Sequence, residues 1–104
     1  MPETLVAIDA GTTGVTCLLL DRELRPILRA YREFPQSFPR PGWVEHDAGD
    51  ILAAVDATLA EVLARPEASD VAALGVTNQR ETVFALDRGA GAALGPGIVW
   101  QDRR

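Results

Sequence analysis

Two short polar stretches hold the residue types of this sequence that could do chemistry. The first, "NQRE" at 78–81, follows the apolar run "VAALGV" at 71–76 after a single threonine, Thr77. Arg80 offers planar, forked hydrogen-bond donors and Glu81 offers acceptors, so the pair could bind neighbouring hydroxyl groups of a polyol. Ligands collect at such strand ends in α/β folds. The alternative is an exposed ion pair on a turn, worth about 0–1 kcal/mol, and composition alone favours that alternative.

The second stretch is "DAGTTG" at 9–14. Gly11 and Gly14 can take positive φ angles, which would let backbone N–H groups converge, and Thr12 and Thr13 add hydroxyl donors. Asp9 ends an apolar run and could hold Mg²⁺, directly or through water. The stretch is neither a Walker loop nor a dinucleotide fingerprint. Without a ligand it would be an Asx-type hairpin turn, and the residues alone favour that alternative over a site for metal-bound phosphate.

Four further side chains have a reactive or recognition chemistry of their own. Trp100 could cover the carbon face of a polyol, although an indole is more often a core residue. Trp43 is expected to pack down a proline-rich loop. His46 is expected to be structural, since no nucleophile lies beside it in the sequence. Cys17 is expected to be a small apolar strand residue.

The elements that must position these residues can be predicted from their periodicity. "TLVAID" at 4–9 and "VTCLLLD" at 15–21 are apolar strands whose five-residue link favours an antiparallel hairpin. "PILRAYREF" at 26–34 alternates with period 2, which is typical of a half-exposed strand near an edge. The stretch at 35–46, with three prolines, predicts an extended loop.

A helix should follow this loop. Asp47 can cap it, and the helix should end near Arg65, before Pro66. Its apolar stripe is expected to consist of Ile51, Leu52, Val55, Leu59, Val62 and Leu63.

The rest of the chain should return to strands. "VAALGVT" at 71–77 predicts a buried strand, parallel to an earlier one because a helix precedes it. "TVFALD" and "GIVW" flank a glycine-rich stretch and predict a hairpin. The order β-β-β-α-β-β-β indicates an α/β fold.

Composition excludes several classes of protein. The chain has 104 residues, of which 47% are apolar, so a real core can form. The net charge of −5 and the lack of a basic cluster argue against nucleic acid as a main partner. A single cysteine excludes an internal disulfide. No apolar run reaches the ~18 residues of a membrane span, and the N-terminus lacks the pattern of a secretory signal. A cytoplasmic location is therefore expected.

Four motifs resemble those of a known family. "DAGTT", "PGWVEHD", "GVTNQRET" and "IVWQDRR" stand in the order and spacing of the FGGY carbohydrate kinases, and specifically of their glycerol kinase branch. The first motif is widespread among ribonuclease H-like, actin-like ATPase folds, whereas "NQRET" and "WQDRR" are more specific. The resemblance runs from about Leu5 to Arg104. It implies the actin-like ATPase fold and ATP-dependent phosphorylation of glycerol at its 3-hydroxyl.

The resemblance also implies roles for individual residues. Arg80 and Glu81 match the pair that hydrogen-bonds glycerol, and Trp100 matches an aromatic residue beside its carbons. Asp9 matches the acid associated with Mg²⁺. The phosphate loop would comprise Gly11, Thr12, Thr13 and Gly14. The implied ligands are glycerol, ATP and Mg²⁺, with neither nucleic acid nor membrane as partner, and the full-length protein is expected to be a homo-oligomer.

Three departures of the loop from the family pattern bear on its chemistry. Ala10 stands where the family commonly has glutamine, Gly14 where it has serine, and Thr16 where an arginine reaches the nucleotide phosphates. A threonine cannot supply that charge, so the affinity for phosphate could differ. Another polyol or sugar kinase of the family therefore stays open as an alternative.

The resemblance covers only the N-terminal portion of the first kinase domain, residues 1–104. The family's catalytic base lies further downstream, so no residue of this chain is expected to be catalytic and the chain alone should be inactive. The uncapped end "IVWQDRR" is typical of a chain cut within a domain. A non-catalytic, truncated remnant is therefore the second alternative. A plain nucleotide-binding module is the third, and the polyol-type strand end argues against it.

Overall fold

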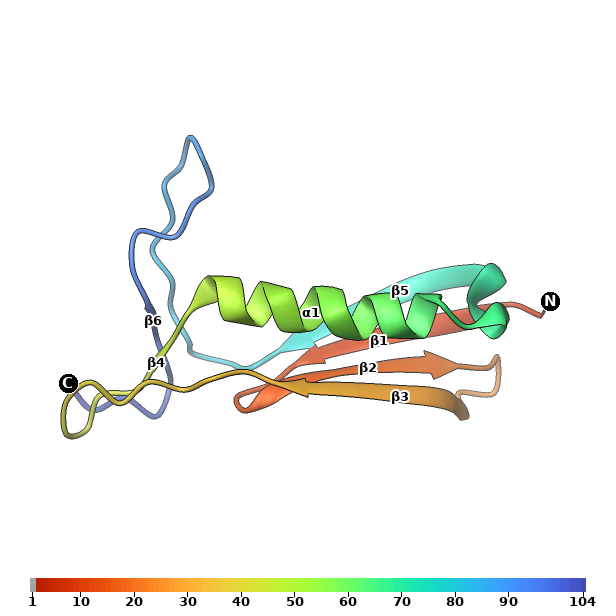
Figure 1. Ribbon diagram of the computed structural model, residues 1–104, viewed down its shortest axis with the longest axis horizontal. Coiled ribbons are helices and arrows are strands. Elements are labelled where there is room, and N and C mark those ends of the chain that lie inside the picture. Colours follow the sequence, from red (N-terminus) through yellow and green to blue (C-terminus); the bar gives the residue numbers. More distant parts are fainter. Residues whose placement is uncertain (1) are drawn as a thin grey trace.

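The computed structural model describes residues 2–104 as an open sheet with one long helix on one face (Figure 1). In this part of the chain, a four-stranded sheet has the order β3-β2-β1-β5, and a small second sheet pairs β4 with β6. The strands are β1 (Thr4–Ala10), β2 (Gly14–Leu20), β3 (Pro26–Glu33), β4 (Glu45–His46), β5 (Val71–Asn78) and β6 (Gly97–Ile98). The helices are α1 (Ala48–Leu63) and the 3₁₀ helix η1 (Pro66–Ser69). The predicted α/β class is confirmed.

The hairpin of β1 and β2 supplies most of the core. The two strands pair antiparallel, as predicted, with Val6 opposite Leu19 and Ile8 opposite Cys17. These four side chains are at most 5% exposed, and Cys17 is the buried strand residue that was expected. Because side chains alternate along a strand, the residues between them lie on the opposite face of the sheet.

Helix α1 covers this core from one side. The Asp47 carboxylate accepts hydrogen bonds from the backbone N–H groups of Gly49 and Asp50, at 2.7 and 3.2 Å, which is the predicted N-cap. The predicted stripe is wrong at two positions, because Leu52 and Leu63 are 62% and 49% exposed. The helix buries Val62, as predicted, together with two smaller residues outside the predicted stripe, Ala54 and Thr58.

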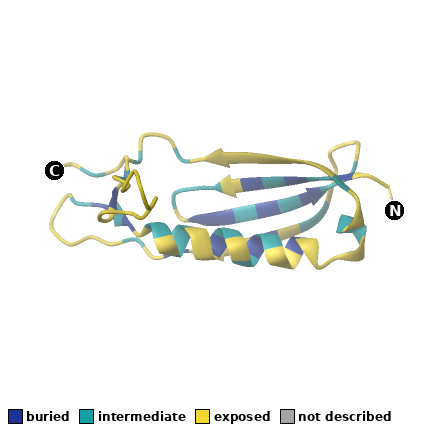
Figure 2. Cartoon of the chain, turned by 90° about the horizontal axis from the view of Figure 1, so that it is seen from above, coloured by how far each residue is buried: buried dark blue, intermediate teal, exposed yellow. Residues whose placement is uncertain are grey.

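Strand β5 lies at the edge of the sheet. It pairs in parallel with β1, as the preceding helix predicted. The expectation that it is buried is wrong: apart from its first residue, β5 is exposed, and Figure 2 shows it in yellow along almost all of its length. The reason is that α1 packs mainly against β2 and β3 and does not reach across to β5.

The segment after β5 differs from the predicted strand hairpin. "TVFALD" contributes only isolated bridges, Val83 to Ile98 and Leu86 to Ala93. Residues 84–97, which include the second bridge, form an arm that projects from the body of the molecule (Figure 1). Ile98 of β6 does exchange two backbone hydrogen bonds with Val83, as the hairpin predicted. Strand β6 also pairs with β4, in a region where an irregular loop was expected. The predicted order of seven elements is therefore wrong in two places: β4 precedes α1 where a loop was expected, and β6 is the one strand that follows β5 in the described residues.

The last residues fasten the proline-rich loop. Asp102 accepts a hydrogen bond from the backbone N–H of Val44 at 2.7 Å. It also forms an ion pair with Arg104 at 2.7 Å. The hydrogen bond from Arg104 holds the pKa of Asp102 well below its usual range. Arg104 also contacts Glu45 at 2.9 Å and lies over the ring of Trp43, 3.8 Å from its centroid. Trp43 thus packs down the loop that contains it, as expected.

The described residues include no helix that is long and apolar enough to cross a membrane.

Candidate functional site

The predicted site residues gather at one end of the main sheet. Strands β1 and β5 end there side by side, and the turn from β1 to β2 lies at the same end (Figure 1). An open pocket of about 440 Å³ lies against this end and is lined by Thr12, Gln79, Arg80, Glu81 and Trp100. The three residues expected to bind a polyol and one residue expected to bind phosphate thus share one pocket.

Trp100 connects the two predicted halves of the site. Its indole Nε1–H donates a hydrogen bond to Thr12 Oγ1 at 3.0 Å, across 88 positions of the sequence. Because the Thr12 oxygen accepts this bond, the hydrogen of its hydroxyl is free to be donated to another group. The ring of Trp100 is 52% exposed and so presents an apolar wall beside a polar hydroxyl.

Arg80 and Glu81 do not form the ion pair that composition favoured. Within residues 2–104, the ion pairs join Arg65 to Glu67 and Arg104 to both Glu45 and Asp102. Glu81 has a φ of 61°, a left-handed conformation that is uncommon for a residue with a side chain. Backbone outliers of this kind are often found at binding sites. The donors of Arg80 and the acceptors of Glu81 are both exposed at the pocket and available to a ligand.

Gln79 holds this strand end against the turn of the first hairpin. Its backbone N–H donates to the carbonyl of Ala10 at 3.0 Å, and its side-chain Nε2 donates to the carbonyl of Gly11 at 3.3 Å. Its Oε1 accepts a bond from the Thr82 hydroxyl at 2.8 Å. Gln79 thus connects the turn that follows β5 to the turn of the first hairpin. Its sequence neighbours carry no signal of this, because Gly11 is 68 positions away.

The side chain of His46 also contacts Gln79. Its Nδ1 lies 3.2 Å from Gln79 Nε2, and the bond from Thr82 identifies that Nε2 as the donor end of the amide. His46 is therefore the acceptor and is neutral, with its proton on Nε2. The side chain is 1% exposed, and burial lowers its pKa. This is a structural role, as the sequence suggested, but it acts on the site residues directly.

The turn at 11–14 is tight without the backbone angles that were predicted. The positive-φ glycines of the described chain are Gly42 and Gly91, so that expectation is wrong for Gly11 and Gly14. The turn is closed by a hydrogen bond from the Gly11 N–H to the Gly14 carbonyl at 2.9 Å. Gly14 is required for space, because a Cβ atom there would lie 2.5 Å from the Arg32 carbonyl oxygen.

Asp9 is exposed at the end of β1, opposite Thr16 of β2 and Thr77 of β5. Among residues 2–104 there is no group of three or more potential metal-binding side chains. A single carboxylate cannot enclose Mg²⁺, but it suits an ion that keeps its waters and is carried by phosphate oxygens. The donor set at Asp9 therefore fits Mg²⁺ bound to a nucleotide and not a permanent metal centre.

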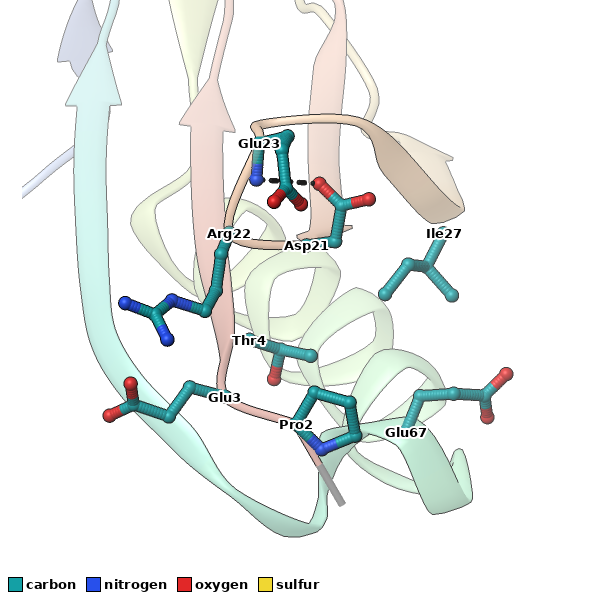
Figure 3. Close-up of a pocket in the computed structure, with 8 residues that line it drawn as sticks. All are labelled: Pro2, Glu3, Thr4, Asp21, Arg22, Glu23, Ile27 and Glu67. Carbon is teal, nitrogen blue, oxygen red and sulfur yellow. Dashed lines mark hydrogen bonds between the residues drawn. The ribbon is translucent and has the colours of Figure 1, made fainter.

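A second cavity, of about 350 Å³, lies at the opposite end of the sheet (Figure 3). The residues lining it include four carboxylates, Glu3, Asp21, Glu23 and Glu67, and one guanidinium, Arg22. An excess of negative charge disfavours phosphate there. This cavity is therefore separate from the candidate site and unsuited to the same ligand.

Comparison with known proteins agrees with this geometry. Residues 4–104 match the model of the FGGY family of carbohydrate kinases, N-terminal domain. The chain belongs to the FGGY family of carbohydrate kinases. It is 51% identical to a glycerol kinase of Agrobacterium fabrum over 102 residues, which cover 96% of this chain and 20% of the relative.

Solved structures of FGGY kinases have the same fold. A glycerol kinase of Plasmodium falciparum with ADP superimposes with a TM-score of 0.88 at 30% identity, over 99% of this chain and 21% of that one. A xylulose kinase of Rhodospirillum rubrum gives a TM-score of 0.90 at 30% identity, over 97% and 21%. The chain thus spans about a fifth of the length of these relatives. The predicted family and actin-like ATPase fold are confirmed.

Proposed function

We propose that residues 1–104 are the N-terminal portion of the first domain of a kinase that transfers the γ-phosphoryl group of ATP to glycerol. The observation that carries the proposal is the single pocket lined by Arg80, Glu81, Trp100 and Thr12. The 51% identity to a glycerol kinase supports glycerol as the acceptor. The solved structures do not discriminate, because a glycerol kinase and a xylulose kinase are both 30% identical to this chain.

The polyol half of the pocket would orient the acceptor. A glycerol hydroxyl both donates and accepts hydrogen bonds, so one hydroxyl can accept from Arg80 while its neighbour donates to Glu81. Trp100 would lie along the carbon chain. Fixing two hydroxyls leaves the third in a defined position, which is the orientation that phosphoryl transfer requires.

The hydrogen bond from Trp100 to Thr12 joins the polyol half of the pocket to the residues that would bind phosphate. Thr12, held by Trp100, would donate its hydroxyl hydrogen to a phosphate oxygen, and Thr13 and the backbone of Gly11 and Gly14 would complete the loop. Asp9 would hold Mg²⁺ through water; the ion, when bound, neutralises charge on the transferred group. The base that takes the proton from the attacking hydroxyl is expected outside residues 1–104, in keeping with the resemblance to the family.

The proposal extends to the surroundings of the full-length protein. We infer a cytoplasmic location, glycerol and ATP as substrates, and a homo-oligomeric assembly, in keeping with the resemblance to glycerol kinases. Because in-line transfer needs a base, a metal and both substrates in alignment, we expect no glycerol-dependent ADP release from residues 1–104 alone.

The test is a coupled ADP-release assay on the full-length gene product with glycerol, a pentitol and D-xylulose as acceptors. Arg80→Gln and Glu81→Gln each remove one charged hydrogen-bonding group, so kcat/KM for glycerol should fall about 10- to 100-fold. The KM for ATP should stay unchanged. Arg88→Gln, in the projecting arm, is the matched control for loss of a charge.

The outcomes separate the candidates. Turnover with D-xylulose and none with glycerol would assign the pocket to another FGGY substrate. Full glycerol activity in both pocket variants would contradict the assignment of Arg80 and Glu81. A wild-type protein that releases no ADP with any acceptor would favour the truncated, non-catalytic alternative.

A further inference from the structure

We propose that Tyr31 of β3 is an additional phosphate-binding residue, whose phenol hydroxyl donates a hydrogen bond to the nucleotide held at the loop 9–14. The inference rests on the proposed function of that loop. Tyr31 lies outside the loop, in a segment whose alternation predicted only a half-exposed strand near an edge.

The register of the sheet brings Tyr31 to the site. Across the β2–β3 pair it lies opposite Thr16, and across the β1–β2 pair Thr16 lies opposite Asp9. Residues that are directly opposite in neighbouring strands point to the same face. Asp9, Thr16 and Tyr31 therefore form a row across three strands, on the face of the sheet away from α1.

The phenol enters the turn itself. A Cβ atom added to Gly14 would lie 2.7 Å from the Tyr31 hydroxyl oxygen and 2.8 Å from its Cζ, so Tyr31 occupies the space that a side chain at position 14 would need. The same hydroxyl lies 3.4 Å from Thr13 Oγ1. Tyr31 thus brings a hydroxyl to a position of the loop where Gly14 has none.

This hydroxyl can serve an anion. When Thr13 is the donor of their shared contact, the Tyr31 oxygen accepts and its hydrogen is free to be donated to a phosphate oxygen. Tyr31 is 38% exposed, so a ligand in the loop can reach it. The Arg29 guanidinium lies 5.2 Å from the centroid of the Tyr31 ring and adds positive charge to a face where Thr16 supplies none.

The acidic residue Glu33, near the loop, does not prevent Tyr31 from binding phosphate. Glu33 lies opposite Gly14 at the end of β3 and carries a negative charge near the turn. On the face of β3 that carries Tyr31, the groups that can attract phosphate are the neutral Tyr31 hydroxyl and the Arg29 cation, whereas Arg32 lies on the opposite face. Tyr31 is the one of them that contacts the loop.

The test is nucleotide binding by the full-length gene product, measured by titration calorimetry without an acceptor substrate. Tyr31→Phe keeps the ring that fills the space above Gly14 and removes only the hydroxyl. We expect the Kd for ATP to rise about tenfold, as for loss of one hydrogen bond to a charged group. The melting temperature and the affinity for adenosine, which has no phosphate, should not change.

Ser69→Ala, which removes a hydroxyl in η1, is the matched control and should bind ATP like the wild type. An unchanged Kd for ATP in Tyr31→Phe, in a protein that phosphorylates glycerol, would overturn the inference and leave the proposed function intact. A tenfold loss in a protein that phosphorylates a different acceptor would support the inference and overturn the choice of glycerol. A wild-type protein that binds no ATP would overturn both.

Discussion

At the scale of single residues, the site depends on contacts that tolerate no added atom. Gly97 of β6 shows this, because a Cβ atom there would overlap the Phe84 ring, 2.5 Å from its Cε1 and 2.7 Å from its Cε2. Phe84 is half-buried beside Gln79 and Thr82, the residues that fix the strand end of the pocket. The ring must therefore move if position 97 gains a side chain.

We expect Gly97→Ala to lower the free energy of unfolding by about 1–3 kcal/mol, the usual cost of overpacking. Urea unfolding of the purified protein measures this. Gly95→Ala is the matched control: nothing lies within 4 Å of its Cβ position, so its free energy of unfolding should stay within about 0.5 kcal/mol of the wild type. Equal stabilities of the two variants would show that Phe84 relaxes without cost.

The type of a residue predicts its chemistry but not its contacts with residues that are distant in the sequence. Asp9, Thr12, Arg80 and Glu81 were singled out because their chemistry suits phosphate or hydroxyl groups. The bond between Trp100 and Thr12 was not predicted, because it joins residues that are distant in sequence. The packing of Tyr31 on Gly14 was missed for the same reason, since the register of two strands decides it.

At the scale of elements, His46 connects three parts of the fold. Through Gln79 it joins β4 to the end of β5 and to the turn of the β1–β2 hairpin. Protonation of His46 would make its Nδ1 a hydrogen-bond donor, and this donor would face Gln79 Nε2, which is also a donor. The Gln79 amide would then have to rotate, and its bonds with Gly11 and Thr82 would break. The network therefore requires neutral histidine.

We expect the protein to lose stability as the pH falls below about 6.5, the ordinary pKa of histidine. Burial lowers the pKa of His46 in the folded state, so the unfolded state binds a proton that the folded state does not. The loss continues down to the folded pKa. His46 is the only histidine of the 104 residues, which assigns the effect.

Urea unfolding of residues 1–104 at several values between pH 7.5 and 5 measures this effect. His46→Gln keeps an acceptor for Gln79 without a titrating group and should give a flatter dependence on pH. A wild-type curve as flat as that of the variant would contradict the prediction.

Periodicity predicted the elements better than it predicted their surroundings. The first hairpin, the edge strand β3, the Asp47 cap and the parallel pairing of β5 all follow from local pattern. The burial of β5 does not, because it depends on how far α1 extends across the sheet. The pairing of β4 with β6 was missed because two-residue strands have no period.

At the scale of the whole molecule, the chain is more extended than its length requires. The radius of gyration is 15.8 Å, whereas a compact domain of this length has about 13 Å. The ordered motifs predicted the family and the fold, but this shape is set by the projecting arm and by the uncovered strand β5, which no motif describes. Leu74 and Val76 lie beside the core residues Val6 and Ile8, yet 49% and 67% of their surface is exposed.

An exposed apolar strand at the edge of a sheet also offers unpaired backbone groups, and this combination promotes association between chains. We therefore expect residues 1–104 to self-associate at micromolar concentrations and above, which sedimentation velocity detects.

Replacing both Leu74 and Val76 with threonine keeps the preference for a strand while removing apolar surface, so it should shift the chain toward monomer. Leu52→Gln removes a comparably exposed leucine from α1 and should leave the association unchanged. If Leu52→Gln dissociates the chains as well as the double variant does, the contact forms through the helix and not through β5. A wild-type chain that sediments as a monomer at these concentrations would contradict the prediction.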